Sequence, residues 1–140
     1  MTTIMVVEDS LSQRELLSYI IRRGGWNVTK FPDGIEALKS LDLQLPDAIV
    51  LDVVMPRMNG YEVCRRLKKH PRTKHIPIIL CSSKGQESDR YWAMKQGADS
   101  YIVKPFHALE LLNSLKNHLD RTSQGERGDL QETISYCQTA

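Results

Sequence analysis

The sequence lacks any long apolar segment and any obvious export signal. No apolar run approaches the roughly 18 residues that a membrane-spanning helix needs, and Met1-Thr2-Thr3 opens without a charged segment and apolar core. Cysteine is scarce too: Cys64, Cys81 and Cys137 are widely spaced and form no CxxC pair. An odd number of such cysteines indicates reduced thiols, not a disulfide framework or a zinc site. We therefore expect a cytoplasmic protein without membrane insertion.

A strong charge of one sign is also missing. Nineteen Lys and Arg against 17 Asp and Glu leave a net charge of +2, so composition predicts no nucleic-acid partner. A length of 140 residues suits one domain, which we place at residues 1–120. Residues 121–140 are polar, with only Leu130, Ile134 and Cys137 at helical spacing. We expect them to form a flexible tail that folding does not need.

Short apolar segments alternate five times with helical patterns. The predicted strands cover residues 4–7, 26–31, 49–52, 76–81 and 99–103, and the predicted helices begin near residues 10, 33, 60, 87 and 109. Strict alternation predicts an α/β protein with a parallel sheet and helices on both faces. The alternation alone leaves the order of the strands open.

Polar residues mark the starts of the first two helices. Ser10 followed by Gln13 has the pattern of a capping box, in which each side chain bonds the other residue's backbone N–H. Asp33 followed by Glu36 marks the second start. Apolar residues then recur at helical spacing, and we assign Leu16, Leu17, Ile20 and Ile21 to the first helix and Leu109, Leu112, Leu115 and Leu119 to the last.

Asp52 ends the most apolar strand of the chain. The run Ile49-Val50-Leu51 reads as a strand buried on both faces, and the carboxyl ends of such strands are where ligands bind in open α/β sheets. An unpaired charge in that position is costly, so Asp52 needs a partner. The other predicted strands end in Glu8-Asp9, Ser82 and Lys104. In a parallel sheet all these side chains meet at one edge.

If these carboxylates, the hydroxyl and the ammonium lie together, they can bind a metal ion and react with a phosphoryl group. Three carboxylates do not all stay ionised side by side without a cation, and oxygen ligands suit Mg²⁺. A carboxylate beside Mg²⁺, Lys and Ser can attack phosphorus and form an aspartyl phosphate. Each residue alone has a plainer explanation: Glu8-Asp9 as a charge pair at a helix N-terminus, Ser82 as a cap, and Lys104-Pro105 as a strand exit.

Together these motifs resemble response-regulator receiver domains of the stand-alone chemotaxis and twitching-motility type, over about residues 3–119. The resemblance rests on four stretches, which are Val6-Val7-Glu8-Asp9-Ser10, Val50-Leu51-Asp52-Val53-Val54-Met55-Pro56 with Gly60, Ser82-Ser83, and Lys104-Pro105-Phe106. It implies a doubly wound five-stranded sheet in the order 2-1-3-4-5 with five helices. It also implies a signalling phosphoacceptor in a two-component phosphorelay, not a turnover enzyme.

The resemblance also assigns roles to single residues. Asp52 would accept a phosphoryl group from a sensor histidine kinase or a histidine phosphotransfer protein. Asp9, Asp52 and the Val54 carbonyl would ligate Mg²⁺, or Mn²⁺ in its place, with Glu8 assisting through water. Ser82 and Lys104 would contact the phosphoryl group. Tyr101 would be the aromatic switch, signalling to an unknown output protein through strand 4, strand 5 and the last helix. Residues 57–65 and 84–92 further resemble cyanobacterial and pilus-motility receivers.

Other functions remain open at this point. The chain could be an intermediate phosphotransfer receiver or a phosphate sink. A phosphohydrolase that works through an aspartyl phosphate would need a second acid two residues after Asp52, where Val54 cannot transfer a proton. A nucleotide or flavin binder would need a glycine-rich loop where Glu8-Asp9-Ser10 stands. A transcription factor would need a DNA-reading unit, which these residues do not suggest.

Overall fold

One parallel sheet of five strands forms the centre of the molecule. The structure is a computed structural model that describes residues 1–122. The strands are β1 (Thr3–Val7), β2 (Asn27–Phe31), β3 (Ala48–Asp52), β4 (Ile78–Ser82) and β5 (Ser100–Val103). Their order in the sheet is β2-β1-β3-β4-β5, and every neighbouring pair is parallel. The predicted α/β fold and strand order are therefore confirmed.

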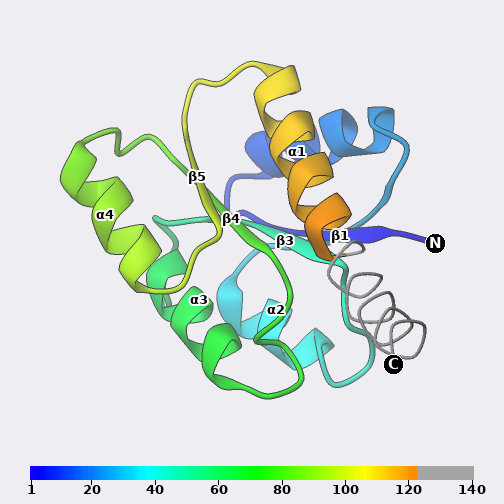
Figure 1. Cartoon of the computed structure of the whole chain (residues 1–140), viewed down its shortest axis with the longest axis horizontal. Helices are drawn as coiled ribbons and strands as arrows, with labels where there is room; N and C mark the ends of the chain where they lie inside the picture. The colour runs from blue at the N-terminus through cyan, green and yellow to red at the C-terminus, as the bar shows by residue number, and fades with distance from the viewer. Residues whose placement is uncertain (123–140) are drawn as a thin grey trace, which may run out of the picture.

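Five helices cover the two faces of the sheet, as predicted. They are α1 (Leu11–Arg23), α2 (Gly34–Ser40), α3 (Gly60–Lys69), α4 (Glu87–Lys95) and a last helix over residues 108–122. Figure 1 shows the last helix beside α1, with α2 and α3 on the other side of the sheet. No helix within residues 1–122 is long and apolar enough to cross a membrane.

The two faces of the sheet carry two separate cores, which explains why β3 is apolar from Ala48 to Leu51. Ile49 and Leu51 pack into the core shared with α2, α3 and α4, whereas Ala48 and Val50 pack into the core shared with α1 and the last helix. All five residues of β3 are buried. Because neither face meets water, the strand has no reason to alternate between apolar and polar residues.

Not every apolar residue of the first and last helices faces the sheet. Leu17 and Ile21 of α1 are buried, but Leu16 is exposed because it lies about 100° around the helix from Leu17. In the last helix Leu111 and Leu115 are buried, whereas Leu109 is exposed. The apolar pattern located both helices correctly but did not identify every residue that faces the sheet.

The predicted helix caps are confirmed in part. Asp33 caps α2 by accepting a hydrogen bond from the Glu36 N–H at 2.9 Å. Ser10 caps α1 by accepting from the Gln13 N–H. The Gln13 side chain, however, accepts a hydrogen bond from Lys104 instead of turning back to Ser10. Most of the predicted tail, from residue 123 onward, lies outside the described residues.

Candidate metal and phosphoacceptor site

Asp52 is the last residue of β3 and lies against the first residue of α3. Asp52 is only 8% exposed. Gly60, the first residue of α3, donates its N–H to the Val53 carbonyl at 2.8 Å, and a Cβ atom at this position would overlap the Asp52 carbonyl oxygen. Glycine is therefore required at position 60 if α3 is to approach the end of β3 so closely. This contact fixes the backbone of Asp52.

Two further carboxylates lie beside Asp52. Strand β1 pairs with β3 in the register Val7 opposite Leu51, so Glu8 and Asp9 follow β1 at the same edge. Carboxylate oxygens of Glu8, Asp9 and Asp52 all lie within 4.8 Å of one another. The structure thus brings together the three acids that the strand ends suggested.

The acid cluster has an excess of negative charge. Glu8 is 1% exposed, and burial, reinforced by the charge of Asp52, raises the pKa of its carboxyl to about 7. Lys104 opposes this shift, with its Nζ 3.4 Å from Glu8 Oε2 and 3.7 Å from Asp52 Oδ1. One ammonium cannot balance three carboxylates. An all-oxygen donor set with unbalanced negative charge, partly open at the exposed Asp9, fits a hydrated Mg²⁺ ion.

The ends of β4 and β5 complete the same edge. Asp52 lies opposite Cys81 in the β3–β4 register, so Ser82 comes one residue beyond it, and Ser82 lies opposite Val103 of β5. Ser82 is fully buried and its Oγ accepts a hydrogen bond from the Lys84 N–H at 3.2 Å. The structure therefore places both the predicted hydroxyl and the predicted ammonium at the Asp52 edge.

Tyr101 points inward and contacts the loop after Ser82. It is 4% exposed, and its hydroxyl donates to the Lys84 carbonyl at 2.6 Å. Arg90 of α4 donates to the Tyr101 carbonyl at 3.2 Å and lies 5.7 Å above the ring. Since Ser82 bonds the N–H of Lys84 and Tyr101 bonds its carbonyl, this one residue links the two predicted switch side chains.

Sequence reasoning missed the role of Arg57. This residue has a φ of 68°, a conformation that is uncommon outside glycine. Its guanidinium pairs with Asp33 Oδ2, while the other Asp33 oxygen caps α2. The pair ties the β3–α3 loop, which carries Val54, to α2. Nothing in the sequence marks an arginine at this loop position as a tether.

An apolar groove adjoins the site along α1. The groove has a volume of about 360 Å³ and is lined by Gln13, Leu16, Leu17, Ile20, Ser83, Lys104, Pro105 and Phe106. We call it the α1 groove. Lys104 belongs both to this groove and to the acid cluster. Leu16, which is exposed, contributes to this accessible apolar surface.

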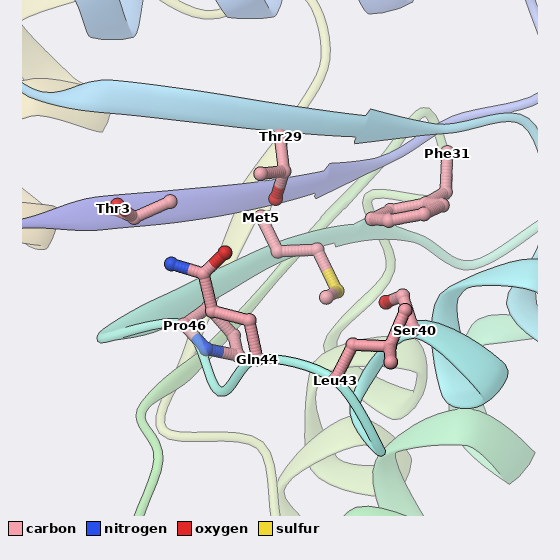
Figure 2. A pocket seen from close by; sticks show the side chains of 8 residues that line it. All are labelled: Thr3, Met5, Thr29, Phe31, Ser40, Leu43, Gln44 and Pro46. Atoms are coloured by element: carbon pink, nitrogen blue, oxygen red, sulfur yellow. The ribbon is translucent and has the colours of Figure 1, made fainter.

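A second cavity lies away from the acid cluster. It has about 160 Å³ and is lined by Thr3, Met5, Thr29, Phe31, Ser40, Leu43, Gln44 and Pro46. Figure 2 shows the Met5 side chain pointing into it from β1, with Leu43 and Ser40 on the far side. None of these eight side chains is charged, so the cavity offers no cation to a phosphate group. It gives no support to the nucleotide-binding alternative.

Comparison with known families identifies the class of protein to which this doubly wound sheet with its acidic edge belongs. The family model described as the response regulator receiver domain matches residues 4–116. The chain therefore belongs to the receiver domain family. It is 41% identical over 134 residues to the phosphate regulon transcriptional regulatory protein PhoB of Rhizobium meliloti. That match covers 96% of this chain and 57% of the relative, and the chain spans about half the length of the curated relatives it matches.

Solved structures show the same fold. The chemotaxis response regulator CheY4 of Vibrio cholerae is 30% identical, with a TM-score of 0.78 over 84% of this chain and 98% of that one. The receiver domain of the sensor histidine kinase PA1611 from Pseudomonas aeruginosa is 29% identical, with a TM-score of 0.79 over 85% and 98%. That structure contains a magnesium ion coordinated in its active-site cleft. Receiver domains are signalling phosphoacceptors, and they bind Mg²⁺ through an acidic pocket.

Proposed function

We propose that this chain is the phosphoacceptor of a two-component phosphorelay and that Asp52 receives the phosphoryl group. The donor would be the phosphohistidine of a sensor histidine kinase or of a histidine phosphotransfer protein. One observation carries the proposal: Asp52 ends the buried central strand with Glu8, Asp9 and Lys104 around its carboxylate. The proposed setting is the cytoplasm.

The transfer itself needs little covalent chemistry from the protein. An Asp52 oxygen attacks phosphorus, an O–P bond forms, and the P–N bond to histidine breaks with its electron pair leaving on the imidazole nitrogen. Lys104 is placed to offset charge on the phosphoryl oxygens. Asp9, Asp52 and the Val54 carbonyl would hold Mg²⁺, with Glu8 acting through water. The bound ion would supply further charge neutralisation at the phosphoryl group.

The switch is proposed to run from Ser82 through Lys84 to Tyr101. A phosphoryl group on Asp52 offers new acceptor oxygens, and the Ser82 hydroxyl can donate to one of them. Because Ser82 and Tyr101 both bond Lys84, a shift of Ser82 reaches Tyr101 through a single residue. The output face comprises β4, β5 and the last helix, together with Trp92 of α4. Phosphate and output partner should strengthen each other by roughly 1–3 kcal/mol.

The α1 groove is the surface we assign to the donor protein. It is lined mostly by apolar side chains, it includes Leu16 and Phe106, and it reaches Lys104 at the acid cluster. A donor seated there would lie next to Asp52, as in-line transfer requires. The occupant we propose is the histidine-bearing helical surface of a sensor kinase or phosphotransfer protein.

Two signalling pathways are candidates for the output of this chain. Taxis or motility signalling is supported by the sequence motifs and by the likeness to CheY4. Regulation of transcription is supported by the likeness to PhoB, whose name describes a transcriptional regulator. In the second case nucleic acid would be contacted by residues beyond these 140. A role as phosphate sink or relay intermediate needs no output face, so Trp92 would then be insensitive to phosphate.

The test is phosphorylation by a small donor. Acetyl phosphate with Mg²⁺ should add one phosphoryl group, visible by mass spectrometry, and EDTA should block the addition. Asp9→Ala should also block it by removing a metal ligand, whereas Asp42→Asn, at an exposed aspartate outside the cluster, should not. Equal labelling with and without Mg²⁺ would count against the proposed site. Turnover of phosphate esters would instead favour a phosphohydrolase.

A further inference from the structure

The ammonium group of Lys104 lies close to three side-chain oxygens. Its Nζ lies 2.5 Å from Gln13 Oε1, 3.4 Å from Glu8 Oε2 and 3.7 Å from Asp52 Oδ1. The contact to Gln13 joins α1 to the loop after β5, across 91 positions of sequence. The closest acceptor is therefore a neutral carboxamide on α1, and the proposed phosphoacceptor is the most distant of the three.

Within residues 1–122 the Gln13 side chain makes no hydrogen bond other than the one to Lys104. Its backbone N–H already satisfies the Ser10 cap, and its exposed carboxamide takes no part in either core. A hydrogen bond to a charged donor is stronger than one between neutral groups. Held by Gln13, the ammonium keeps only a long contact of 3.7 Å with Asp52 Oδ1.

We infer that Gln13 is a positioning residue that holds Lys104 away from Asp52 in the unphosphorylated chain and so lowers its readiness to accept a phosphoryl group. The inference rests on the proposed function of Asp52. Gln13 also lines the α1 groove, so a donor protein seated in the groove contacts it and frees Lys104. A small phosphodonor makes no such contact. Gln13 thereby favours transfer from a docked protein over adventitious phosphorylation.

Isosteric substitutions test the inference directly. Gln13→Met keeps the length of the side chain and removes the acceptor, whereas Gln13→Glu keeps the shape and adds a charge that holds Lys104 more firmly. Both residues are good helix formers, so α1 should persist. The loss of one exposed hydrogen bond to a charged group predicts a roughly 3- to 10-fold faster reaction of Gln13→Met with acetyl phosphate. Beryllofluoride should bind more tightly to Gln13→Met by a similar factor, and Gln13→Glu should be slower than wild type.

A matched control is available at Gln44. This exposed glutamine lines the cavity of Figure 2, away from the acid cluster, so Gln44→Met should react like wild type. Mg²⁺ affinity, measured for each variant, corrects the Gln13→Glu rate for its added charge. The ¹⁵N shift of Lys104 Nζ provides a readout without any phosphodonor. It should move in Gln13→Met and stay in Gln44→Met.

The outcomes separate this inference from the proposed function. A Gln13→Met rate equal to or below that of a labelled wild type, or an unmoved Lys104 resonance, would overturn the role of Gln13 and leave Asp52 as the acceptor. A wild type that acetyl phosphate does not label would overturn the proposed function and the role of Gln13 with it. A faster Gln13→Met with a shifted Lys104 resonance is the result we expect.

Discussion

Two loops leave the site edge from neighbouring strands, and they are built in opposite ways. The β3–α3 loop, residues 53–59, buries Met55 and Met58 and is tied to α2 through Arg57 and Asp33. The β4–α4 loop, residues 83–86, is exposed throughout. Its connection to the sheet runs through the backbone of Lys84, bonded on one side to Ser82 and on the other to Tyr101.

The helices that follow these two loops also differ in how many of their side chains are buried. Helix α3 buries Val63, Cys64 and Leu67, whereas α4 buries only Ala93 and leaves Trp92 exposed. Segments with few buried apolar contacts open at low free-energy cost. We infer from this difference that the β3–α3 loop and α3 keep Asp52 in position. The β4–α4 loop and α4 would then move when Asp52 is phosphorylated.

The largest expected effect is on stability, and it differs between α3 and α4. Leu67→Ala should lower the free energy of unfolding by about 2–5 kcal/mol, because Leu67 is 2% exposed and its removal leaves a cavity. Trp92→Ala, which removes a larger side chain that is 52% exposed, should change stability by less than about 1 kcal/mol. Urea unfolding of both variants measures the difference. Equal losses would show that α4 is anchored as firmly as α3.

A second effect concerns the Glu8 carboxyl group, which lies beside Asp52 at the start of the β3–α3 loop. The pKa of Glu8 rises from 4.5 in the unfolded chain to about 7 in the fold, so the folded protein binds more protons between these values. Its contribution to stability is complete below pH 4.5 and is lost as pH rises through 7, by up to about 3 kcal/mol.

Thermal unfolding in EDTA between pH 5 and 8 measures this slope. Glu8→Gln should flatten it, because the amide does not titrate. Mg²⁺ should restore stability above pH 7, where the carboxylates are ionised and able to bind the ion. A metal-free protein that became more stable as pH rose from 5 to 8 would contradict the assigned shift.

The smallest effect concerns the β4–α4 loop. Tyr101→Phe removes the hydroxyl that bonds the Lys84 carbonyl and should cost about 1 kcal/mol of stability. In a Trp26→Phe background, where Trp92 is the one tryptophan left in the sequence, it should also weaken the fluorescence change that beryllofluoride produces, because the link from Ser82 to the output face is cut. Tyr91→Phe is the matched control, since Tyr91 is an exposed side chain on α4. An unchanged fluorescence response in Tyr101→Phe would place the coupling elsewhere.

The comparison also explains what the sequence could predict. Glu8, Asp52 and Lys104 lie together because parallel strands align their ends, so position along the chain translates directly into proximity. Apolar periodicity located the helices, but neighbouring leucines compete for one inward face, and Leu16 lies outside it.

Other features depend on contacts that no local pattern encodes. Gln13 fits a capping box equally well by spacing, and only the approach of Lys104 from the end of β5 decides its partner. The tether between Arg57 and Asp33 likewise joins two loops that are separated by a strand and a helix.

We propose that Asp52, which borders the β3–α3 loop, is the phosphoacceptor. Mass spectrometry of the chain treated with acetyl phosphate and Mg²⁺, compared with Asp52→Asn, tests it most directly. We predict one added phosphoryl group on the wild-type chain and none on Asp52→Asn, which keeps the size of the side chain and removes the nucleophilic carboxylate. Labelling of Asp52→Asn equal to that of the wild type would contradict the account.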